Sequence, residues 1–416
     1  MGKRVEIEQK YYCSNHKELL KIIKLNRLKK VSEKYESDEY FTDINSIYIK
    51  NRTCLRIRNV NNDYLELTFK GKSKEFTNNY AKIENNIKMD FSNYDSIVGL
   101  LYSLGYFSYS IVNKNRITYS KKIGNYEYNV MIDTIENLGD FVEFELLYYE
   151  KDKDINYLQR KLNEFVSKFQ ELNFESANLP YRDFVANKTF ISILPQEKLN
   201  AILFDLDGTL INSEEKFFES FRHVIETKFN YTITFEEYEN NELKQNANLI
   251  KKLQQDGIID GLMTQEVIMR DVYLEYEKRF MELLDENEVS LNFELLKQLK
   301  SKGLRLALVS TSRRKFIDLL LKKLGIENLF EIIISREDVK NLKPSPDAYI
   351  MALNMLNISS NNCIAFEDSE RGIVASKNAN IKTIQVNDFA KKKISSTDIS
   401  EKLSRILLSI INHIGE

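Results

Sequence analysis

Hydrophobic and polar residues alternate with a period of two in several short segments of the first 150 residues. Such alternation predicts β-strands, and short strands at close spacing are typical of an antiparallel sandwich or barrel. The segments are Val5–Tyr11, Thr53–Arg58, Tyr64–Lys70, Tyr80–Lys88, Ile111–Tyr119, Tyr126–Ile132 and Phe141–Leu147. Helices are expected between them at about residues 15–27, 93–104 and 154–172.

The pattern changes after about residue 200, where apolar runs of about five residues alternate with helical stretches. Strands that alternate with helices predict a parallel α/β sheet of the Rossmann-like kind. The runs are Ala201–Phe204, Arg305–Val309, Glu331–Ile334, Cys363–Phe366 and Thr383–Val386. A polar helical insert at about 213–290 interrupts this rhythm, and we expect it to form a helical cap over the sheet.

The change of pattern falls between two prolines, Pro180 and Pro195, so we place a domain junction near residues 185–197. A chain of 416 residues is long for one hydrophobic core, which also favours more than one domain. We therefore expect an α+β antiparallel barrel domain over residues 1–185 and an α/β domain over residues 198–416.

Composition narrows the classes of function. Hydrophobic content of 43%, charged content of 29% and a net charge of −2 are those of an ordinary globular protein, with no field that favours nucleic acid or an anionic membrane. Three cysteines and three histidines are too few and too scattered for a disulfide framework or a zinc site. No apolar run reaches the ~18 residues of a membrane span, and the N-terminus is not signal-like. We expect a cytoplasmic protein; its oligomeric state stays open.

The segment Phe204–Leu210, with sequence FDLDGTL, carries the first candidate chemistry. Asp205 and Asp207 follow a predicted buried strand, at the carboxyl edge where open α/β sheets bind ligands. A carboxylate nucleophile suits phosphoryl transfer, because water can cleave the resulting acyl-phosphate. A second carboxylate two residues later can protonate the leaving oxygen and then deprotonate the water. A polar turn at a strand end would explain the Asp-Gly pair alone, but not the whole string.

Three further candidates lie at the ends of later predicted strands. Ser310 is placed to hydrogen-bond a phosphate oxygen, and Lys343 to neutralise the nucleophile and the transferring group. Taken singly, Ser310 suits a strand-end hydroxyl and Lys343 a surface lysine; their order along the chain favours a site. The predicted Mg²⁺ ligands are Asp205, the Asp207 carbonyl, Glu367 and Asp368.

These four motifs resemble those of the haloacid dehalogenase superfamily, over about residues 199–390. The resemblance implies an aspartyl-phosphate mechanism, and its residues with their roles are Asp205 (nucleophile), Asp207 (general acid/base), Ser310 and Lys343 (phosphate ligands), Asp368 (metal ligand) and Glu367 (helper). The position of the cap resembles the phosphoglycolate phosphatase and phosphoglucomutase branch. Mutases of that branch carry a catalytic histidine twelve residues after the nucleophile, where this chain has Phe217, and this favours hydrolysis. Relatives also place a glycine near Asn378–Asn380, a departure that we expect to affect packing only.

In the first half, charged residues share one face of each predicted strand. Glu6, Glu8 and Lys10 alternate with apolar or neutral residues, and so do the pairs on later strands. These pairs are Arg56 and Arg58, Glu66 and Lys70, Lys82 and Glu84, Lys114 and Arg116, and Glu143 and Glu145. Either the charges face water, as in many antiparallel sheets, or they line a closed barrel that binds polyphosphate and divalent metal.

Resemblance favours the second interpretation. Glu6-x-Glu8-x-Lys10 resembles the ExExK signature of the CYTH superfamily of triphosphate tunnel enzymes, and the similarity covers roughly residues 3–175. Further matching pieces follow in order: Asp38–Asp43, Leu55–Arg58, Thr68–Gly71, Lys114–Arg116, Asp133, and Leu138–Glu145. The resemblance implies metal ligands at Glu6, Glu8, Glu143 and Glu145, triphosphate contacts from Lys10, Arg56, Arg58, Lys70, Lys82 and Arg116, and a role for Lys114 in orienting the attacking group.

Two positions depart from that family's pattern. Lys82 stands where an arginine is usual, which keeps the charge but loses the bidentate fork. Asn86 stands where a second acidic residue is common, which weakens one expected metal site.

The leading hypothesis is a bifunctional metal-dependent phosphohydrolase. Its first half would cleave a nucleoside, thiamine or inorganic triphosphate with Mg²⁺ or Mn²⁺, and its second half would hydrolyse a phosphomonoester with Mg²⁺, as a phosphoglycolate phosphatase-like enzyme. Two alternatives stay open for the first half: a class IV adenylyl cyclase that makes cyclic AMP from ATP, or a non-catalytic sensor of a phosphorylated ligand that controls the phosphatase. The expected partners are small phosphorylated metabolites or nucleotides.

Overall fold

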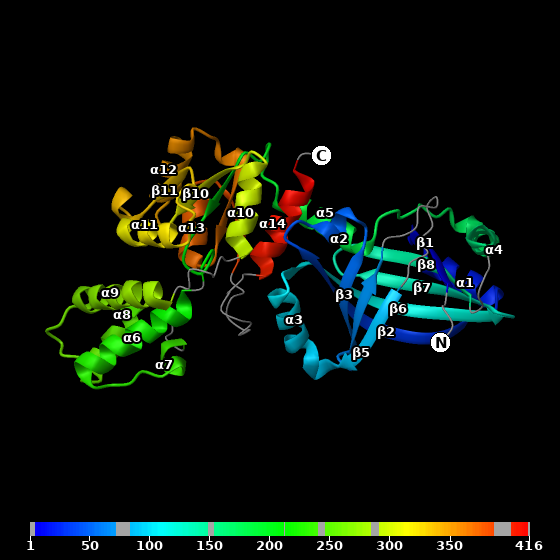
Figure 1. Cartoon of the computed structure of the whole chain (residues 1–416), viewed down its shortest axis with the longest axis horizontal. Helices are drawn as coiled ribbons and strands as arrows, with labels where there is room; N and C mark the ends of the chain where they lie inside the picture. Colours follow the sequence, from blue (N-terminus) through cyan, green and yellow to red (C-terminus); the bar gives the residue numbers. More distant parts are fainter. Residues whose placement is uncertain are drawn as a thin grey trace. The chain divides into compact units, whose positions relative to one another are not determined.

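The structure, a computed structural model, describes residues 5–71, 84–148, 154–211, 213–239, 246–283, 291–386 and 401–414 (Figure 1). The chain forms two compact units. The first comprises Met1–Ser192 with Leu408–Ile414, and the second comprises Ile193–Leu407. None of the helices among the described residues combines the length and the apolar character needed to span a membrane.

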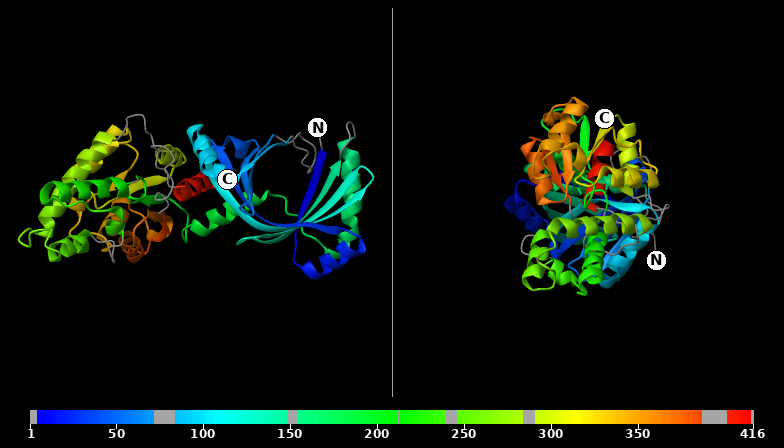
Figure 2. Two further views of the ribbon diagram at one scale, coloured as in Figure 1. Left: turned by 90° about the horizontal axis from the view of Figure 1, so that it is seen from below. Right: turned by 90° about the vertical axis from the view of Figure 1, so that its left-hand side faces the viewer.

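The first unit contains one antiparallel sheet of eight strands in the order β1-β8-β7-β6-β2-β3-β4-β5. The strands are β1 (Val5–Tyr12), β2 (Lys29–Asp43), β3 (Cys54–Val60), β4 (Tyr64–Lys70), β5 (Glu84–Asp90), β6 (Tyr106–Ile123), β7 (Tyr126–Ile135) and β8 (Gly139–Tyr148). Figure 2 shows in its left view how strongly these strands curve. The pairings recorded among the described residues leave β1 and β5 as the two edges.

Two helices, α1 (His16–Leu25) and α4 (Ile155–Val166), pack on the apolar face of this sheet. The other α-helices of this unit among the described residues before residue 200 are α2 (Ile47–Lys50), α3 (Tyr94–Ser103) and α5 (Tyr181–Ile193). Ile7 of β1, Phe144 of β8 and Leu158 of α4 belong to one buried cluster. Because successive residues of a strand point to opposite faces, Glu6 and Glu8 lie on the other face of the sheet.

That other face is charged and largely withdrawn from water. Its buried charged residues are Glu36, Asp38, Arg56, Lys114, Asp133, Glu143 and Glu145. A solvated polar face would leave such side chains exposed, so the interpretation with the charges in water does not hold for these residues. The antiparallel strand-rich fold predicted for this half is confirmed.

Strand β2 was absent from the predicted strands. Its fifteen residues, KKVSEKYESDEYFTD, are mostly polar and show no run of alternating apolar residues. It forms because it pairs with β3 on one side and β6 on the other, with Asp38 opposite Arg58 and Glu36 opposite Lys114. Opposite charges directly across the sheet stabilise a strand that its own propensity does not favour.

The second unit contains a parallel five-stranded sheet in the order β11-β10-β9-β12-β13, which confirms the predicted α/β class. The strands are β9 (Ala201–Phe204), β10 (Arg305–Val309), β11 (Ile332–Ile334), β12 (Cys363–Glu367) and β13 (Lys382–Gln385). The helices that follow them in this unit are α10 (Leu291–Ser301), α11 (Arg314–Lys323), α12 (Asp347–Leu356) and α13 (Glu370–Asn378).

The predicted insert between the first two of these strands is helical wherever the structure describes it. Its helices are α6 (Glu214–Phe229), α7 (Phe235–Glu239), α8 (Asn246–Gln255) and α9 (Gln265–Leu283). Phe221, Ile250 and Ile268 belong to a core cluster of this insert, separate from the cluster that contains Leu203 and Ala365 of the sheet. The insert therefore packs around its own core.

Two local features bear on the sequence. Asn380 adopts a left-handed backbone with φ 58°, a conformation that asparagine tolerates better than most residues. The last helix, α14 (Glu401–His413), ends in the first unit, where Ser409 donates a hydrogen bond to the Ala186 carbonyl and His413 stacks on Phe190.

Candidate active sites

Lys343 connects the candidate nucleophile to the acidic residues at the carboxyl edge of the parallel sheet. Its Nζ donates to Asp205 Oδ1 at 2.5 Å, to Glu367 Oε1 at 2.6 Å and to the Val309 carbonyl at 2.7 Å. Burial by itself would lower the pKa of Lys343, but the charges of Asp205 and Glu367 outweigh it and raise that pKa. Lys343 is therefore a buried cation held on Asp205, not a surface lysine.

Three carboxylates at this edge are arranged in a way that fits a metal ion. Asp205, Glu367 and Asp368 each offer an oxygen within 4.8 Å of the others. The Glu367 Oε2 atom is buried and has no hydrogen-bond partner among the described residues. Burial and the charge of Glu367 raise the pKa of Asp368 to about 7. Crowded carboxylates with an unsatisfied oxygen are what a divalent cation would stabilise.

Two glycines leave room for this cluster. A Cβ atom on Gly208 would lie 2.2 Å from Asp368 Oδ2, and Gly208 also has φ +76°. A Cβ atom on Gly372 would lie 1.9 Å from Glu367 Oε2. A side chain at either position would displace a carboxylate of the cluster, so both glycines are needed for the close approach of backbone and carboxylate.

Asp207 lies beside the cluster, and both its carboxylate oxygens accept hydrogen bonds. The Tyr276 hydroxyl of α9 donates to Oδ1 at 2.9 Å, and Ser312 Oγ donates to Oδ2 at 2.6 Å. Ser310 is buried at the end of β10, and its Oγ accepts from the Ser312 backbone N–H at 2.9 Å. Phe217 packs against Tyr276, with ring centroids 5.4 Å apart. The sequence-predicted residues of this unit thus lie at one edge of the sheet.

Sequence reasoning missed the residues that support this site. The Tyr349 hydroxyl donates to Glu367 Oε1, and the Arg371 guanidinium donates to the Lys343 carbonyl. Ser312 lies only two residues from Ser310, and this spacing was an available signal. Tyr276 lies in the insert, where no motif marks it.

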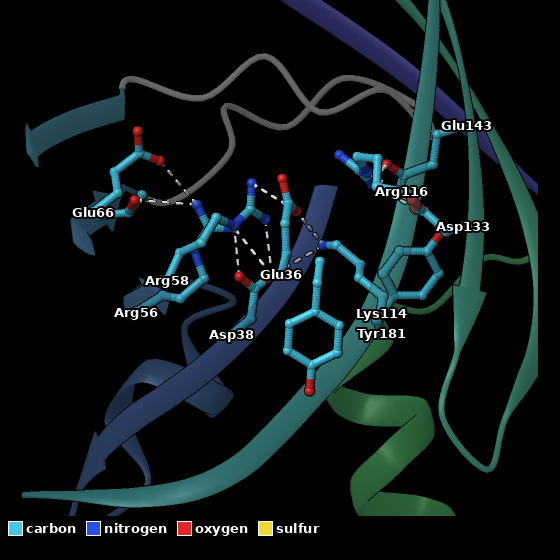
Figure 3. A network of polar contacts seen from close by, with 12 residues as sticks. Glu36, Asp38, Arg56, Arg58, Glu66, Lys114, Arg116, Asp133, Glu143 and Tyr181 are labelled. Carbon is cyan, nitrogen blue, oxygen red and sulfur yellow. Dashed lines mark hydrogen bonds and ion pairs between the residues drawn. The ribbon is translucent and has the colours of Figure 1, made fainter. Parts of the chain in front are cut away.

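The charged face of the first unit centres on Asp38 (Figure 3). Arg58 donates to both oxygens of Asp38, at 2.6 and 2.8 Å, and Lys114 Nζ donates to Oδ2 at 3.0 Å. Glu36 pairs with the same two cations at 3.2 and 3.3 Å, and Arg56 lies 3.6 Å from Asp38. Burial would raise the pKa of Asp38, but Arg58, Lys114 and Arg56 together hold it well below its usual range.

A second group surrounds Arg116 on the same face. Its guanidinium donates to Asp133 at 2.6 and 2.5 Å and to Glu143 at 2.5 Å. Lys10 pairs with Glu143 at 3.2 Å and lies 3.8 Å from the centroid of the Tyr181 ring. The Tyr181 hydroxyl donates to Asp133 at 2.8 Å. Figure 3 shows Arg116, Asp133, Glu143 and Tyr181 pointing toward one another from different strands and from α5.

The candidate metal ligands of the first unit face one another across β1 and β8. Glu8 is opposite Glu145, and Lys10 is opposite Glu143. Burial and the charge of Glu143 raise the pKa of Glu8, with Glu6 adding to the effect and Lys70 opposing it. Like charges directly across a sheet are destabilising unless a cation lies between them. Among the described residues, three carboxylates within reach of one ion are found only at Asp205, Glu367 and Asp368, so metal binding by Glu6, Glu8, Glu143 and Glu145 stays a prediction.

Lys82 and Asn86 are the two positions that depart from the expected pattern of this half. Lys82 lies outside the described residues. Asn86 lies in β5 opposite Thr68, whose hydroxyl accepts from Arg56 at 3.1 Å. Sequence reasoning missed Glu36 and Tyr181 as parts of the charged face, and it quoted Asp38 and Asp133 without giving them a role.

Comparison with known proteins agrees with both halves. Residues 202–386 match the haloacid dehalogenase-like hydrolase family, and residues 4–180 match the CYTH domain. The chain is 33% identical over 190 residues to the phosphorylated carbohydrates phosphatase of Thermotoga maritima, which covers 45% of this chain and 84% of that protein. It is 30% identical over 194 residues to the pyrophosphatase PpaX of Bacillus mycoides, which covers 46% of this chain and 84% of that protein.

Among solved structures, CbbY from Rhodobacter sphaeroides in complex with phosphate is 26% identical, with a TM-score of 0.39 over 48% of this chain and 92% of that chain. The family matches show that the chain belongs to the haloacid dehalogenase-like hydrolases. It carries a CYTH domain before the hydrolase domain. The resemblance stated from the motifs is confirmed.

Proposed function

We propose that the second unit is a Mg²⁺-dependent phosphatase that works through Asp205, in a chain that carries two phosphate-handling sites. The observation that carries this proposal is the convergence of Lys343, Glu367 and Asp368 on Asp205 at the carboxyl edge of the sheet. A cation and a metal-binding cluster beside one carboxylate are the requirements for attack on a phosphate dianion.

In the proposed reaction, an Asp205 oxygen attacks phosphorus and the bond to the ester oxygen breaks. Asp207 gives its proton to the leaving oxygen in that step. Asp207 then takes a proton from water, whose oxygen attacks phosphorus and releases phosphate and the Asp205 carboxylate. Lys343 offsets negative charge near the reacting group, and Ser310 supplies a hydroxyl donor at the same edge.

Asp205, Glu367, Asp368 and the Asp207 carbonyl would hold the metal ion. When bound there, Mg²⁺ supplies positive charge that stabilises the phosphoryl oxygens. Small phosphorylated metabolites are the proposed substrates, by analogy with relatives named for phosphorylated carbohydrates and pyrophosphate. Phe217 in place of a catalytic histidine supports hydrolysis over phosphate transfer between two positions of a sugar.

The test is a panel of phosphomonoesters and pyrophosphate with Mg²⁺, assayed by phosphate release from the wild type and from Asp205→Asn. The wild type should release phosphate from at least one compound, and Asp205→Asn should lose that turnover while its melting temperature stays comparable. Turnover retained by Asp205→Asn would refute the assignment of the nucleophile.

For the first unit we propose a triphosphatase that uses Mg²⁺ or Mn²⁺. The proposal is supported by the opposed carboxylates Glu8 and Glu145 and by a cationic set on the same face. The proposed triphosphate ligands are Lys10, Arg56, Arg58, Lys70, Lys82 and Arg116, with Lys114 orienting the attacking group and Glu6, Glu8, Glu143 and Glu145 binding metal. Glu8→Gln should abolish phosphate release from tripolyphosphate, nucleoside triphosphates and thiamine triphosphate, whereas Asp205→Asn should retain it.

One observation favours the sensor as a second candidate for this unit. Arg58, Lys114 and Arg116 are already paired with carboxylates, so a ligand must compete with Glu36, Asp38 and Asp133 for them. The same panel separates the candidates. Turnover lost in Glu8→Gln identifies an enzyme, cyclic AMP formed from ATP identifies a cyclase, and binding of tripolyphosphate without turnover identifies a sensor.

A further inference from the structure

The hydrogen bonds of Asp207 come from two different parts of the second unit. Tyr276 belongs to α9 of the helical insert, and its hydroxyl donates to Asp207 Oδ1 at 2.9 Å. Ser312 belongs to the segment after β10, and its hydroxyl donates to Oδ2 at 2.6 Å. A carboxylate has about four lone-pair positions, so two donors orient its plane and still leave positions for a proton and a leaving oxygen.

The Tyr276 side chain is itself fixed by packing. It is 3% exposed, and its ring lies 5.4 Å from that of Phe217 in α6, 5.6 Å from Phe280 in α9 and 5.6 Å from Phe316 in α11. A ring held by aromatic neighbours from three helices has little freedom to move its hydroxyl, and a buried phenol keeps its polar partner.

These contacts tie Asp207 to the insert. Phe316 belongs to the helix that follows β10, whereas Phe217 and Phe280 belong to the insert, so Tyr276 lies where the insert meets the sheet domain. An acid that protonates a leaving oxygen must point at that oxygen within hydrogen-bond reach, and a small rotation of the carboxyl group is enough to lose the contact.

We propose that Tyr276 is a positioning residue for Asp207: its hydroxyl sets the orientation of the Asp207 carboxyl group, so that proton transfer to the leaving oxygen depends on α9 being docked at the site. This inference rests on the role proposed for Asp207. In the step concerned, the bond from phosphorus to the ester oxygen breaks, the bond from phosphorus to Asp205 forms, and the Asp207 proton moves to the departing oxygen. Tyr276 does not touch the reacting atoms and keeps its own proton.

The test uses the full chain with Mg²⁺ and two aryl phosphates that differ in leaving group. The 4-nitrophenolate ion leaves readily without protonation, whereas the more basic phenolate ion depends on the acid. Tyr276→Phe removes one hydroxyl and keeps the ring. For this variant, kcat/KM for phenyl phosphate should fall at least tenfold more than kcat/KM for 4-nitrophenyl phosphate, and the fall should appear in kcat. A difference of this size is expected because general acid catalysis contributes about 10²–10⁴-fold to a rate.

Tyr273→Phe is the matched control. Tyr273 lies one turn earlier on α9, and its ring also contacts Phe217, at 5.4 Å. No hydrogen bond from its hydroxyl is recorded among the described residues. Removing the Tyr273 hydroxyl should change kcat/KM for the two substrates by the same factor. Ser312→Ala removes the other hydrogen bond of Asp207 without changing the aromatic packing, and it should show the same preference as Tyr276→Phe.

Equal losses of kcat/KM on both substrates in Tyr276→Phe would mean that the hydroxyl does not act through protonation of the leaving oxygen, and unchanged kcat/KM would mean that it does nothing for Asp207; either result overturns the inference. Asp205→Asn separates this outcome from failure of the proposed function. If Asp205→Asn is inactive and Tyr276→Phe shows no dependence on leaving group, only the positioning role fails. If Asp205→Asn remains active, the proposed phosphatase mechanism fails first.

Discussion

Replacing Asp38 by asparagine tests whether the charges of the first unit are buried as a compensated network. Asp38 is 0% exposed and accepts hydrogen bonds from Arg58 at 2.6 and 2.8 Å and from Lys114 at 3.0 Å. Asparagine keeps the shape and one acceptor oxygen but removes the negative charge that compensates these cations. Removing one partner of a buried ion pair costs about 3–5 kcal/mol, because the other charge remains buried and uncompensated.

The lower end of that range applies, since asparagine retains one hydrogen-bond acceptor. A loss of about 3 kcal/mol in a unit of this size corresponds to a fall of roughly 6–12 °C in melting temperature. Scanning calorimetry of the full chain measures it. The matched control is Glu33→Gln in the same strand, whose pair with Lys30 has side chains 59% and 48% exposed, and exposed pairs contribute only about 0–1 kcal/mol.

The difference in stability between the wild type and Asp38→Asn should also depend on pH. Because the cations around Asp38 hold its folded pKa well below the unfolded value of about 3.9, its contribution is complete above that value and is lost as pH falls toward the folded pKa. The difference in stability between wild type and Asp38→Asn should therefore be constant from neutral pH down to about 4 and shrink below it. A change in melting temperature no larger than that of Glu33→Gln, or a difference that does not shrink in acid, would refute the buried network.

Three further predictions concern the second unit. Burial and the charge of Glu367 raise the pKa of Asp368 to about 7, so protons and Mg²⁺ compete for its carboxylate. The Mg²⁺ affinity of the wild type, measured by titration calorimetry, should therefore rise between about pH 6 and pH 8, and that of Asp368→Asn should rise less. Parallel pH profiles for the two proteins would contradict this prediction. Replacing glycine by alanine in an ordinary helix stabilises a protein by about 0.5–1 kcal/mol. Gly372→Ala should instead lower the melting temperature and the Mg²⁺ affinity, because the new Cβ atom would lie 1.9 Å from Glu367 Oε2. A stabilised variant would disprove this close approach. Lys343→Met should abolish phosphatase turnover. Without Mg²⁺ it should also destabilise the second unit by about 3–5 kcal/mol, because Asp205 and Glu367 lose the cation that they share. Calorimetry at low and high Mg²⁺ measures this loss, and an unchanged melting temperature at low Mg²⁺ would contradict the prediction.

Both fold classes could be predicted from the sequence, because the apolar residues follow a period of two in the first half and form short buried runs in the second. Strand β2 could not, since Glu36 and Asp38 become buried only when Arg58 and Lys114 arrive from neighbouring strands. Its stability is a property of the assembled sheet and not of its own residues.

The candidate site of the second unit shows the same division. Asp205 and Lys343 lie in motifs at the ends of strands. Because parallel strands bring their carboxyl ends to one edge of the sheet, the proximity of these two residues could be predicted from the sequence. Tyr276 lies 69 residues from Asp207, in an insert without a motif, and reaches it only through aromatic packing between helices. Residues that act through tertiary packing carry no local signal.

The central claim is that Asp205 carries the phosphoryl group, and the most direct measurement looks for that group. The full chain with Mg²⁺ and a turned-over phosphomonoester would be quenched in acid during turnover, digested and analysed by mass spectrometry. The account predicts phosphate on the peptide that contains Asp205 in the wild type, and no phosphorylated peptide in Asp205→Asn. A phosphoryl group on another residue, or turnover by Asp205→Asn, would contradict it.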